Sequence, residues 1–187
     1  MRIIAGKAGG INLKSLKGRD VRPTLDRVKE SLFNIIAYYI EGAEVLDLFA
    51  GFGSLGIEAL SRGAEHADFV ESERRHLKII KENLEKSNLK EYASVYQNDV
   101  FDFLESCQKR YDLIFMDPPY KRDFTEKTIN MIIENNLLEE QGLIISEKDS
   151  SEEKFEFEEL NIIKDREYGN TVITIYQLNK DRKWDYD

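Results

Sequence analysis

A carboxylate, two prolines and an aromatic ring stand together at Asp117-Pro118-Pro119-Tyr120, directly after the apolar residues 111–116. The apolar run predicts a buried strand. Two prolines cannot continue a sheet ladder, so a rigid loop must begin there. Ligands bind at the carboxyl ends of strands in open α/β sheets. The four residues could therefore hold a planar amine, such as the exocyclic NH2 of a nucleobase, although a Pro-Pro pair alone would fit an ordinary tight loop.

A glycine-rich loop follows another predicted strand, at 45–49. Gly51, Gly53 and Gly56 have the G-x-G-x-x-G spacing of nucleotide-binding folds. Glu71 ends the next predicted strand, where such folds place an acid that binds ribose hydroxyls. A tight strand-to-helix turn would explain the glycines alone. The glycines and the acid together favour a nucleotide-like ligand.

Four successive predicted strands end with an acidic residue, namely Asp47, Glu71, Asp99 and Asp117. Asp47 suits the ammonium group of S-adenosylmethionine (SAM), which has no phosphate for the glycine loop to bind. Asp99 could accept a hydrogen bond from adenine N6, with the Val100 N–H near a ring nitrogen. Asp99 also fits a helix N-cap, and it could serve both purposes. Because packing hardly explains one acid per strand end, the pattern favours SAM over a dinucleotide.

Strands and helices alternate along the middle of the chain, which predicts an α/β fold with a doubly wound, mostly parallel sheet. Two late strands, at 160–163 and 172–176, predict an antiparallel hairpin at the sheet edge. Residues 2–16 predict a small hairpin, and Thr24 is the predicted N-cap of a first helix that ends near Gly42. The remaining predicted strands lie at 45–49, 67–70, 93–97, 113–116 and 142–146, and the remaining helices at 55–61, 74–86, 100–108 and 124–136.

The composition suits one globular domain, because 41% of the 187 residues are hydrophobic and 34% are charged. No apolar run approaches the roughly 18 residues of a membrane span, and no signal peptide opens the chain, so we expect a cytoplasmic protein. Cys107 is the only cysteine, which excludes an internal disulfide. One cysteine and two histidines without a ligand-like spacing do not favour a zinc or iron site.

The net charge of −9 argues against indiscriminate binding to nucleic acid. Its distribution is uneven, because residues 1–30 hold eight Lys or Arg against three acidic residues. A basic N-terminal arm on an acidic body could contact a nucleic acid. A solvated basic hairpin without a partner would fit the charge equally well.

Across its whole length, the chain resembles the class I SAM-dependent methyltransferases, whose sheet has seven strands. More narrowly, it resembles the bacterial family that methylates the N2 amine of a guanine in 16S ribosomal RNA. The order of an Arg-Pro-Thr segment, the glycine loop and Asp-Pro-Pro-Tyr is specific to that family. The motifs that carry the resemblance are residues 2–7, 22–30, 46–51, 58–64, 117–120 and 168–169.

The resemblance implies methyl transfer to guanine N2, with Asp117, Pro118 and Tyr120 as the catalytic residues. The Asp117 carboxylate and the Pro118 carbonyl would accept hydrogen bonds from the two amine N–H groups and localise the lone pair, while Tyr120 would stack on the base. A base inside a helix must be flipped out to reach such a pocket. The cofactor-binding residues implied are Asp47, Phe49, Gly51, Gly53, Glu71, Asp99 and Val100, and the RNA-binding residues are Arg2, Lys7, Lys14, Arg22, Thr24 and Arg27.

Three residues depart from the family pattern, namely Phe52 in the glycine loop, Ile11 in the arm and Lys148 after Glu147. Three other functions stay open: methylation of adenine N6 in DNA or RNA, an NAD-dependent oxidoreductase, and a non-catalytic nucleotide-binding module. The oxidoreductase would have no use for Asp-Pro-Pro-Tyr, and the binding module would not need Asp117.

We expect three segments, namely a basic RNA-contacting arm at 1–22, a methyltransferase domain at 23–179 and a charged tail at 180–187. The expected partner is 16S ribosomal RNA within an assembling small subunit. We expect the protein to be a monomer.

Overall fold

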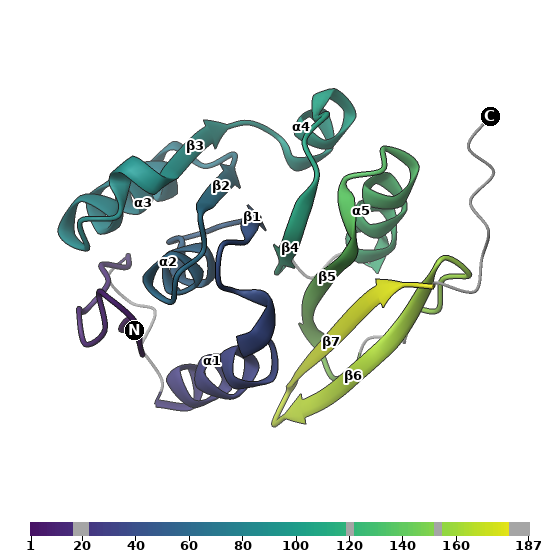
Figure 1. Cartoon of the computed structure of the whole chain (residues 1–187), viewed down its shortest axis with the longest axis horizontal. Coiled ribbons are helices and arrows are strands. Elements are labelled where there is room, and N and C mark those ends of the chain that lie inside the picture. Colours follow the sequence, from purple (N-terminus) through teal and green to yellow (C-terminus); the bar gives the residue numbers. More distant parts are fainter. Residues whose placement is uncertain (17–22, 119–121, 152–154, 180–187) are drawn as a thin grey trace.

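A computed structural model of the chain describes residues 1–16, 23–118, 122–151 and 155–179. One seven-stranded sheet has the order β3-β2-β1-β4-β5-β7-β6 (Figure 1). The first five strands are parallel, whereas β7 runs antiparallel to both of its neighbours. The strands are β1 (Glu44–Leu48), β2 (His66–Glu71), β3 (Ala93–Gln97), β4 (Tyr111–Met116), β5 (Leu138–Asp149), β6 (Leu160–Tyr168) and β7 (Thr171–Leu178).

Helices cover both faces of the sheet. In Figure 1, α1, α2 and α3 lie on one face, and α4 and α5 lie on the other. Each face has its own apolar core, and consecutive residues of β1 such as Val45 and Leu46 alternate between the two. The helices are α1 (Pro23–Ile35), α2 (Ser54–Ser61), α3 (Arg74–Lys86), α4 (Val100–Ser106) and α5 (Arg122–Glu134), with 3-10 turns at Ala37–Tyr39 and Lys90–Tyr92.

The strand order reverses between β1 and β4. The chain passes from β1 outward to β3 and then crosses back to β4 on the other side of β1. Loops that leave β1 and β4 therefore diverge, which opens a crevice at the carboxyl ends of these strands. The predicted doubly wound, mostly parallel sheet with a C-terminal antiparallel hairpin is confirmed.

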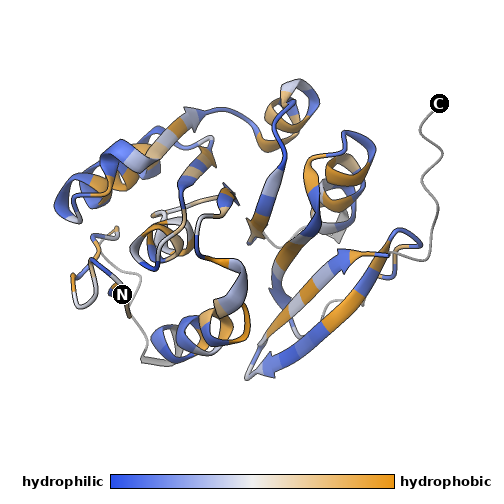
Figure 2. Ribbon diagram, viewed as in Figure 1, coloured by the Kyte–Doolittle hydropathy of each residue, from blue (hydrophilic) through white to orange (hydrophobic). Residues whose placement is uncertain are grey.

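Strand β5 is much longer than the predicted strand at 142–146. Its middle pairs in parallel with β4, and its second half continues antiparallel beside β7 to Asp149. Along β6 and β7 the hydrophobic and hydrophilic bands alternate (Figure 2), as expected where one face is covered and the other meets water. Tertiary pairing with the hairpin thus extends β5 beyond its apolar run.

Helix α1 begins at Pro23, one residue before the predicted N-cap Thr24, which lies inside the first turn. Proline suits that position because its missing N–H has no partner in a first turn and its φ is fixed near the helical value. The helix ends at Ile35, earlier than predicted, and a 3-10 turn continues the chain to Tyr39. Helix α4 ends at Ser106, two residues before the predicted end.

The N-terminal segment, residues 1–16, packs against the domain. Ile3 is fully buried and Ala8 and Leu13 are nearly so, and all three belong to the core on the α1 side. A single antiparallel bridge joins Arg2 to Asn12, so the predicted hairpin is a closed loop with one bridge instead of a ladder. Gly6 has φ +83°, and a Cβ there would lie 1.8 Å from the Ser61 carbonyl oxygen, so only glycine fits this contact.

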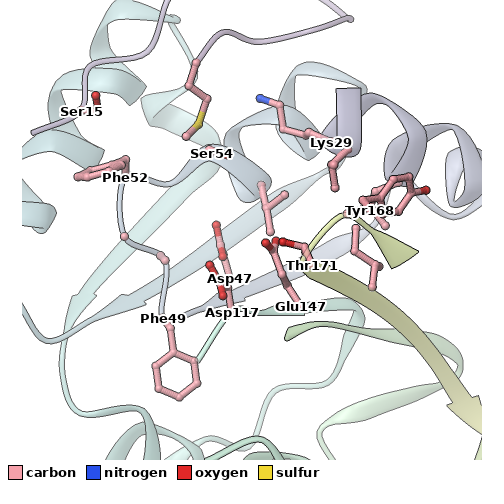
Figure 3. A pocket seen from close by; sticks show the side chains of 17 residues that line it. Ser15, Lys29, Asp47, Phe49, Phe52, Ser54, Asp117, Glu147, Tyr168 and Thr171 are labelled. Carbon is pink, nitrogen blue, oxygen red and sulfur yellow. The ribbon is translucent and has the colours of Figure 1, made fainter. Parts of the chain in front are cut away.

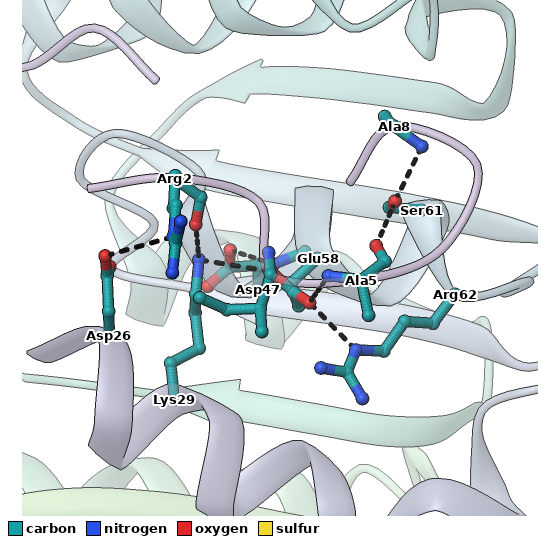
Figure 4. Close-up of polar contacts among 11 residues, drawn as sticks. Arg2, Ala5, Ala8, Asp26, Lys29, Asp47, Glu58, Ser61 and Arg62 are labelled. Carbon is teal, nitrogen blue, oxygen red and sulfur yellow. Dashed lines mark hydrogen bonds and ion pairs between the residues drawn. The ribbon is translucent and has the colours of Figure 1, made fainter. Parts of the chain in front are cut away.

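Glu58 on α2 is the main polar anchor of this segment (Figure 4). Its fully buried carboxylate accepts hydrogen bonds from the Ile4 and Ala5 N–H groups at 2.8 and 3.1 Å. The same carboxylate pairs with Arg62 at 2.8 Å and with Lys29 at 3.2 Å. Two cations and two amide groups thus compensate one buried charge, and they join the segment to α1 and α2.

Among the described residues, no helix is both long enough and apolar enough to cross a bilayer.

Candidate functional site

Three carboxylates lie at the carboxyl end of the sheet, on the face covered by α1. Phe115 lies opposite Asp47 in β1 and Ile145 in β5. Side chains two residues apart share a face, so Asp117 and Glu147 extend beyond Phe115 and Ile145 on the side of Asp47. Figure 3 shows the three carboxylates pointing toward one another. The strand register therefore places three acids from three neighbouring strands at one point.

A cavity of about 270 Å3 opens at this point. The glycine loop after β1 forms one wall, helix α1 another, and the β6–β7 hairpin a third (Figure 3). It is large enough for a small organic group and is open to solvent. The residues that line it include Lys29, Leu32, Asp47, Phe49, Gly51, Phe52, Asp117, Glu147, Tyr168 and Thr171.

Asp47 is the most buried acid of the cavity, with 3% of its surface exposed. Its Oδ2 accepts a hydrogen bond of 2.9 Å from the Gly56 N–H at the start of α2. Burial, together with the charges of Asp117 and Glu71, raises the pKa of Asp47 to about 8, although the hydrogen bond from Gly56 acts in the opposite direction. A cation beside Asp47 would stabilise the carboxylate.

The glycine loop has the backbone shape of a ligand-binding turn. Phe49, Gly51 and Gly53 have φ of 55°, 55° and 76°, in the left-handed region. For Phe49 this conformation is strained, which is common where a chain is held against a ligand. The Phe49 ring points away from the carboxylates and packs against Phe124, with centroids 6.2 Å apart (Figure 3). The third glycine, Gly56, leaves space for the Phe69 ring, which would lie 2.4 Å from a Cβ.

Glu71 holds the glycine loop in place. Its Oε2 accepts a 2.9 Å hydrogen bond from the Gly51 N–H, and its Oε1 accepts one of 2.8 Å from the Glu73 N–H. His76 Nδ1 lies 3.4 Å from Oε2, and the Phe52 ring meets the His76 ring edge-on. Glu71 does not line the cavity of the three carboxylates. It lies at the neighbouring strand end, where it could accept ribose hydroxyls with its remaining lone pairs.

Asp99 is the N-cap of α4, since its Oδ1 accepts a 2.8 Å hydrogen bond from the Phe101 N–H. The sequence had allowed an N-cap role for Asp99 as well as a role in binding adenine. The side chain is also exposed at the end of β3, so it retains room for a ligand. Val100 is buried under the same turn. Neither residue lines the cavity of Asp47, so the implied cofactor residues span two adjoining regions of the sheet edge.

The predicted catalytic residues follow β4 directly. Asp117 is exposed and lines the cavity, whereas Pro118 is buried beside it. Tyr120 lies outside the described residues, so its stacking role stays a prediction.

Glu147 was given no role by the sequence. It is half-buried on β5 and lines the cavity opposite Asp47. Burial and then the charge of Asp117 raise the pKa of Glu147 to about 7. The sequence did carry a signal for this position, because the buried side chains of Leu143 and Ile145 alternate along the strand and Glu147 continues the alternation on the same face.

Those predicted RNA-binding cations that the structure describes are exposed, and several already have partners within the chain. Arg2 Nε lies 3.8 Å from Asp26, and Lys14 pairs with Glu82. Lys7 Nζ lies 3.8 Å from the centre of the Tyr92 ring. Arg27 is exposed on α1, Arg22 lies outside the described residues, and the side chain of Thr24 is not described.

Among the described residues, no cluster of three or more His, Cys, Asp or Glu has a geometry that could hold a metal ion. The cavity suits the cationic amino-acid end of SAM better than a phosphate, because Asp47 is a buried acid.

The fold and the acidic site at its switch point define a methyltransferase-like α/β domain. A structure described as "Putative methyltransferase yhhF from Escherichia coli" superposes with a TM-score of 0.85 at 32% identity, over 96% of this chain and 98% of the other. A structure of the "putative methylase HI0767 from Haemophilus influenzae" gives a TM-score of 0.81 at 36% identity, over 96% and 98%.

The chain belongs to the family described as "Conserved hypothetical protein 95", whose model matches residues 1–177. It is 42% identical to "Putative rRNA methyltransferase YlbH" of Bacillus subtilis over 95% of this chain and 98% of that protein. It is 38% identical to "Ribosomal RNA small subunit methyltransferase D" of Haemophilus influenzae over 95% and 93%. The family resemblance predicted from the motifs is thereby confirmed.

Proposed function

We propose that this protein transfers a methyl group from SAM to the exocyclic N2 amine of a guanine in 16S ribosomal RNA. The observation that carries the proposal is the convergence of Asp47 and Asp117 at one cavity on the switch point of the sheet, with Pro118 next to Asp117 in the chain. The relatives named as ribosomal RNA methyltransferases support the same substrate class.

Asp117 and Pro118 would activate the amine. The lone pair of an aromatic amine is delocalised into its ring, so the amine is a poor nucleophile. The Asp117 carboxylate and the Pro118 carbonyl would each accept a hydrogen bond from one amine N–H, which localises the lone pair and fixes its direction. Asp117 would then take the proton that the amine loses.

SAM, when bound, supplies an electrophilic methyl group on a sulfonium. The chain contributes position and charge: Asp47 would hold the ammonium, Glu71 the ribose, and Asp99 with the Val100 N–H the adenine. Phe49, Gly51 and Gly53 would let the backbone approach this ligand closely. Tyr120 would stack on a base that has been flipped out of its helix.

The basic N-terminal segment would contact the RNA through Arg2, Lys7 and Lys14, with Arg22, Thr24 and Arg27 nearer the target base. The acidic remainder favours a protein-containing small-subunit precursor over free RNA as substrate, because it would repel bare phosphates. We further propose that the protein works as a monomer in the cytoplasm.

The test is to map methylated nucleosides in 16S ribosomal RNA from cells with and without the gene. One N2-methylguanosine should disappear and return with the wild-type gene, but not with Asp117→Ala. Disappearance of an N6-methyladenosine, or no change in any nucleoside, would contradict the proposal.

A further inference from the structure

Glu147 lies beside Asp117 at the carboxyl end of the sheet. In the parallel pairing of β4 with β5, Met116 lies opposite Ser146, so the next residues of the two strands are neighbours. Neighbouring strands are about 4.8 Å apart. Beyond this point β5 pairs with β7, where Glu147 lies opposite Ile173. The side chain therefore projects from a part of β5 that is still paired with β7 on one side, which fixes its position.

The Glu147 carboxylate faces the cavity (Figure 3). Within the part of the chain that the structure describes, no hydrogen bond or ion pair engages it. The charged side chains that share the cavity are Asp47 from β1, Asp117 after β4 and Lys29 from α1. The polar ones are Tyr168 and Thr171 from the hairpin, Ser54 from α2 and Ser15 from the N-terminal segment.

Lys29 is already engaged by other groups. Its Nζ lies 2.6 Å from the Arg2 carbonyl oxygen and 3.2 Å from the Glu58 carboxylate. Tyr168 is also engaged, because its hydroxyl forms a 2.6 Å hydrogen bond with Ser31 on α1. Glu147 is thus available to whatever enters the cavity beside Asp117.

Guanine presents its N2 amine and its N1–H side by side on one edge, and both are hydrogen-bond donors. Adenine presents a bare N1 lone pair beside its N6 amine. An ionised carboxylate only accepts hydrogen bonds. Two carboxylates on adjacent strands would therefore complement the edge of guanine and oppose a lone pair at N1.

We propose that Glu147 accepts a hydrogen bond from the N1–H of the target guanine and so sets the base preference of the site. This inference rests on the proposed methylation of guanine N2 by the same cavity. A site built to pair a donor rejects an analogue that lacks it, because its own buried group is left unpaired. Burial and the charge of Asp117 raise the pKa of Glu147 in the free protein, and an N–H donor would lower it again by favouring the ionised carboxylate.

The test uses a base that keeps the amine but has no N1–H. Small-subunit particles are reconstituted with 16S ribosomal RNA that carries either guanine or 2-aminopurine at the mapped target. The wild-type protein should prefer guanine by at least about tenfold in kcat/KM, as for removal of a hydrogen bond to a charged group. Glu147→Gln can donate to a bare N1, so it should methylate guanine more slowly and 2-aminopurine faster, which lowers the preference by roughly tenfold or more.

Glu140→Gln is the matched control, because Glu140 is exposed on the same strand. It should keep the wild-type preference, and both variants should keep wild-type SAM affinity by calorimetry. If Glu147→Gln binds SAM normally yet keeps the wild-type preference, the role of Glu147 is refuted while guanine methylation stands. A wild-type protein that does not distinguish the two bases refutes it equally. Methylation of an adenine instead would overturn both the role and the proposed function.

Discussion

Asp47 links cofactor binding to proton binding. The pKa of its carboxyl group is about 8 in the free protein because the group is buried. Asp47 is therefore protonated in most molecules at pH 7. A SAM cation would require the carboxylate, so binding should release a proton and grow tighter as the pH rises from 6 through 8. The affinity should change by at most about tenfold per pH unit below that pKa.

Calorimetry in buffers of different ionisation enthalpy measures this proton release directly. Asp47→Asn should bind SAM more weakly and remove most of the pH dependence. Asp102→Asn, which alters an exposed acid on α4, is the control and should behave as wild type. A pH-independent affinity in the wild-type protein would show that Asp47 does not meet the cation.

Asp117 should act on the target amine and contribute little to SAM affinity. Asp117→Ala removes an acceptor that lies at the surface of the cavity, so the fold should survive. Methyl transfer should fall by roughly 10²- to 10³-fold, as for loss of one group that stabilises a transition state. Single-turnover transfer from labelled SAM to small-subunit particles, with SAM affinity measured in parallel, would check both parts. A variant that transfers methyl groups at half the wild-type rate would exclude the role.

At the scale of elements, the buried carboxylate of Glu58 joins the N-terminal segment to α1 and α2. Glu58→Ala leaves Lys29 and Arg62 without their partner and removes the acceptor of the Ile4 and Ala5 N–H groups. Removing one partner of a buried ion pair lowers the free energy of unfolding by about 3–5 kcal/mol. Urea unfolding should show that loss, and hydrogen exchange should show faster exchange at residues 4 and 5.

The control is Glu82→Ala, which removes the exposed partner of Lys14 and should change the unfolding midpoint very little. Unchanged exchange at residues 4 and 5 in Glu58→Ala would mean that apolar burial of Ile3 alone holds the segment.

The sequence predicted most elements of the sheet because apolar runs and glycine or proline boundaries coincide along 44–116. It placed Asp47 and Asp117 at the carboxyl ends of their strands because Asp47 lies late in one such run and Asp117 directly follows another. Glu147 was missed because β5 continues past its apolar run, and only pairing with β7 makes that extension a strand. The docking of residues 1–16 was missed for a similar reason. It depends on Glu58, a charged residue whose burial becomes evident only when Lys29 and Arg62 surround it.

At the scale of the whole molecule, charge divides the protein into a basic N-terminal region and an acidic remainder. Arg2, Lys7 and Lys14 are exposed, and their contacts with Asp26, Tyr92 and Glu82 are those of surface groups. Such contacts are weak, so phosphates could replace them at little cost. The segment can therefore be docked on the domain and still present cations to RNA.

Changing Arg2, Lys7 and Lys14 together to Ala should weaken RNA binding and flatten its salt dependence. Each RNA phosphate that the variant no longer neutralises should reduce the log–log slope by roughly 0.7–0.9, since fewer counterions are released on binding. The matched control is the triple change of Lys127, Lys164 and Arg166 to Ala, because these cations lie on α5 and β6, away from the N-terminal segment. The measurement is RNA affinity across a salt series for the three proteins, with SAM affinity as a check of folding. Equal slopes for the wild-type protein and the N-terminal variant would show that the segment serves the fold alone, because its cations would then release no counterions when RNA binds.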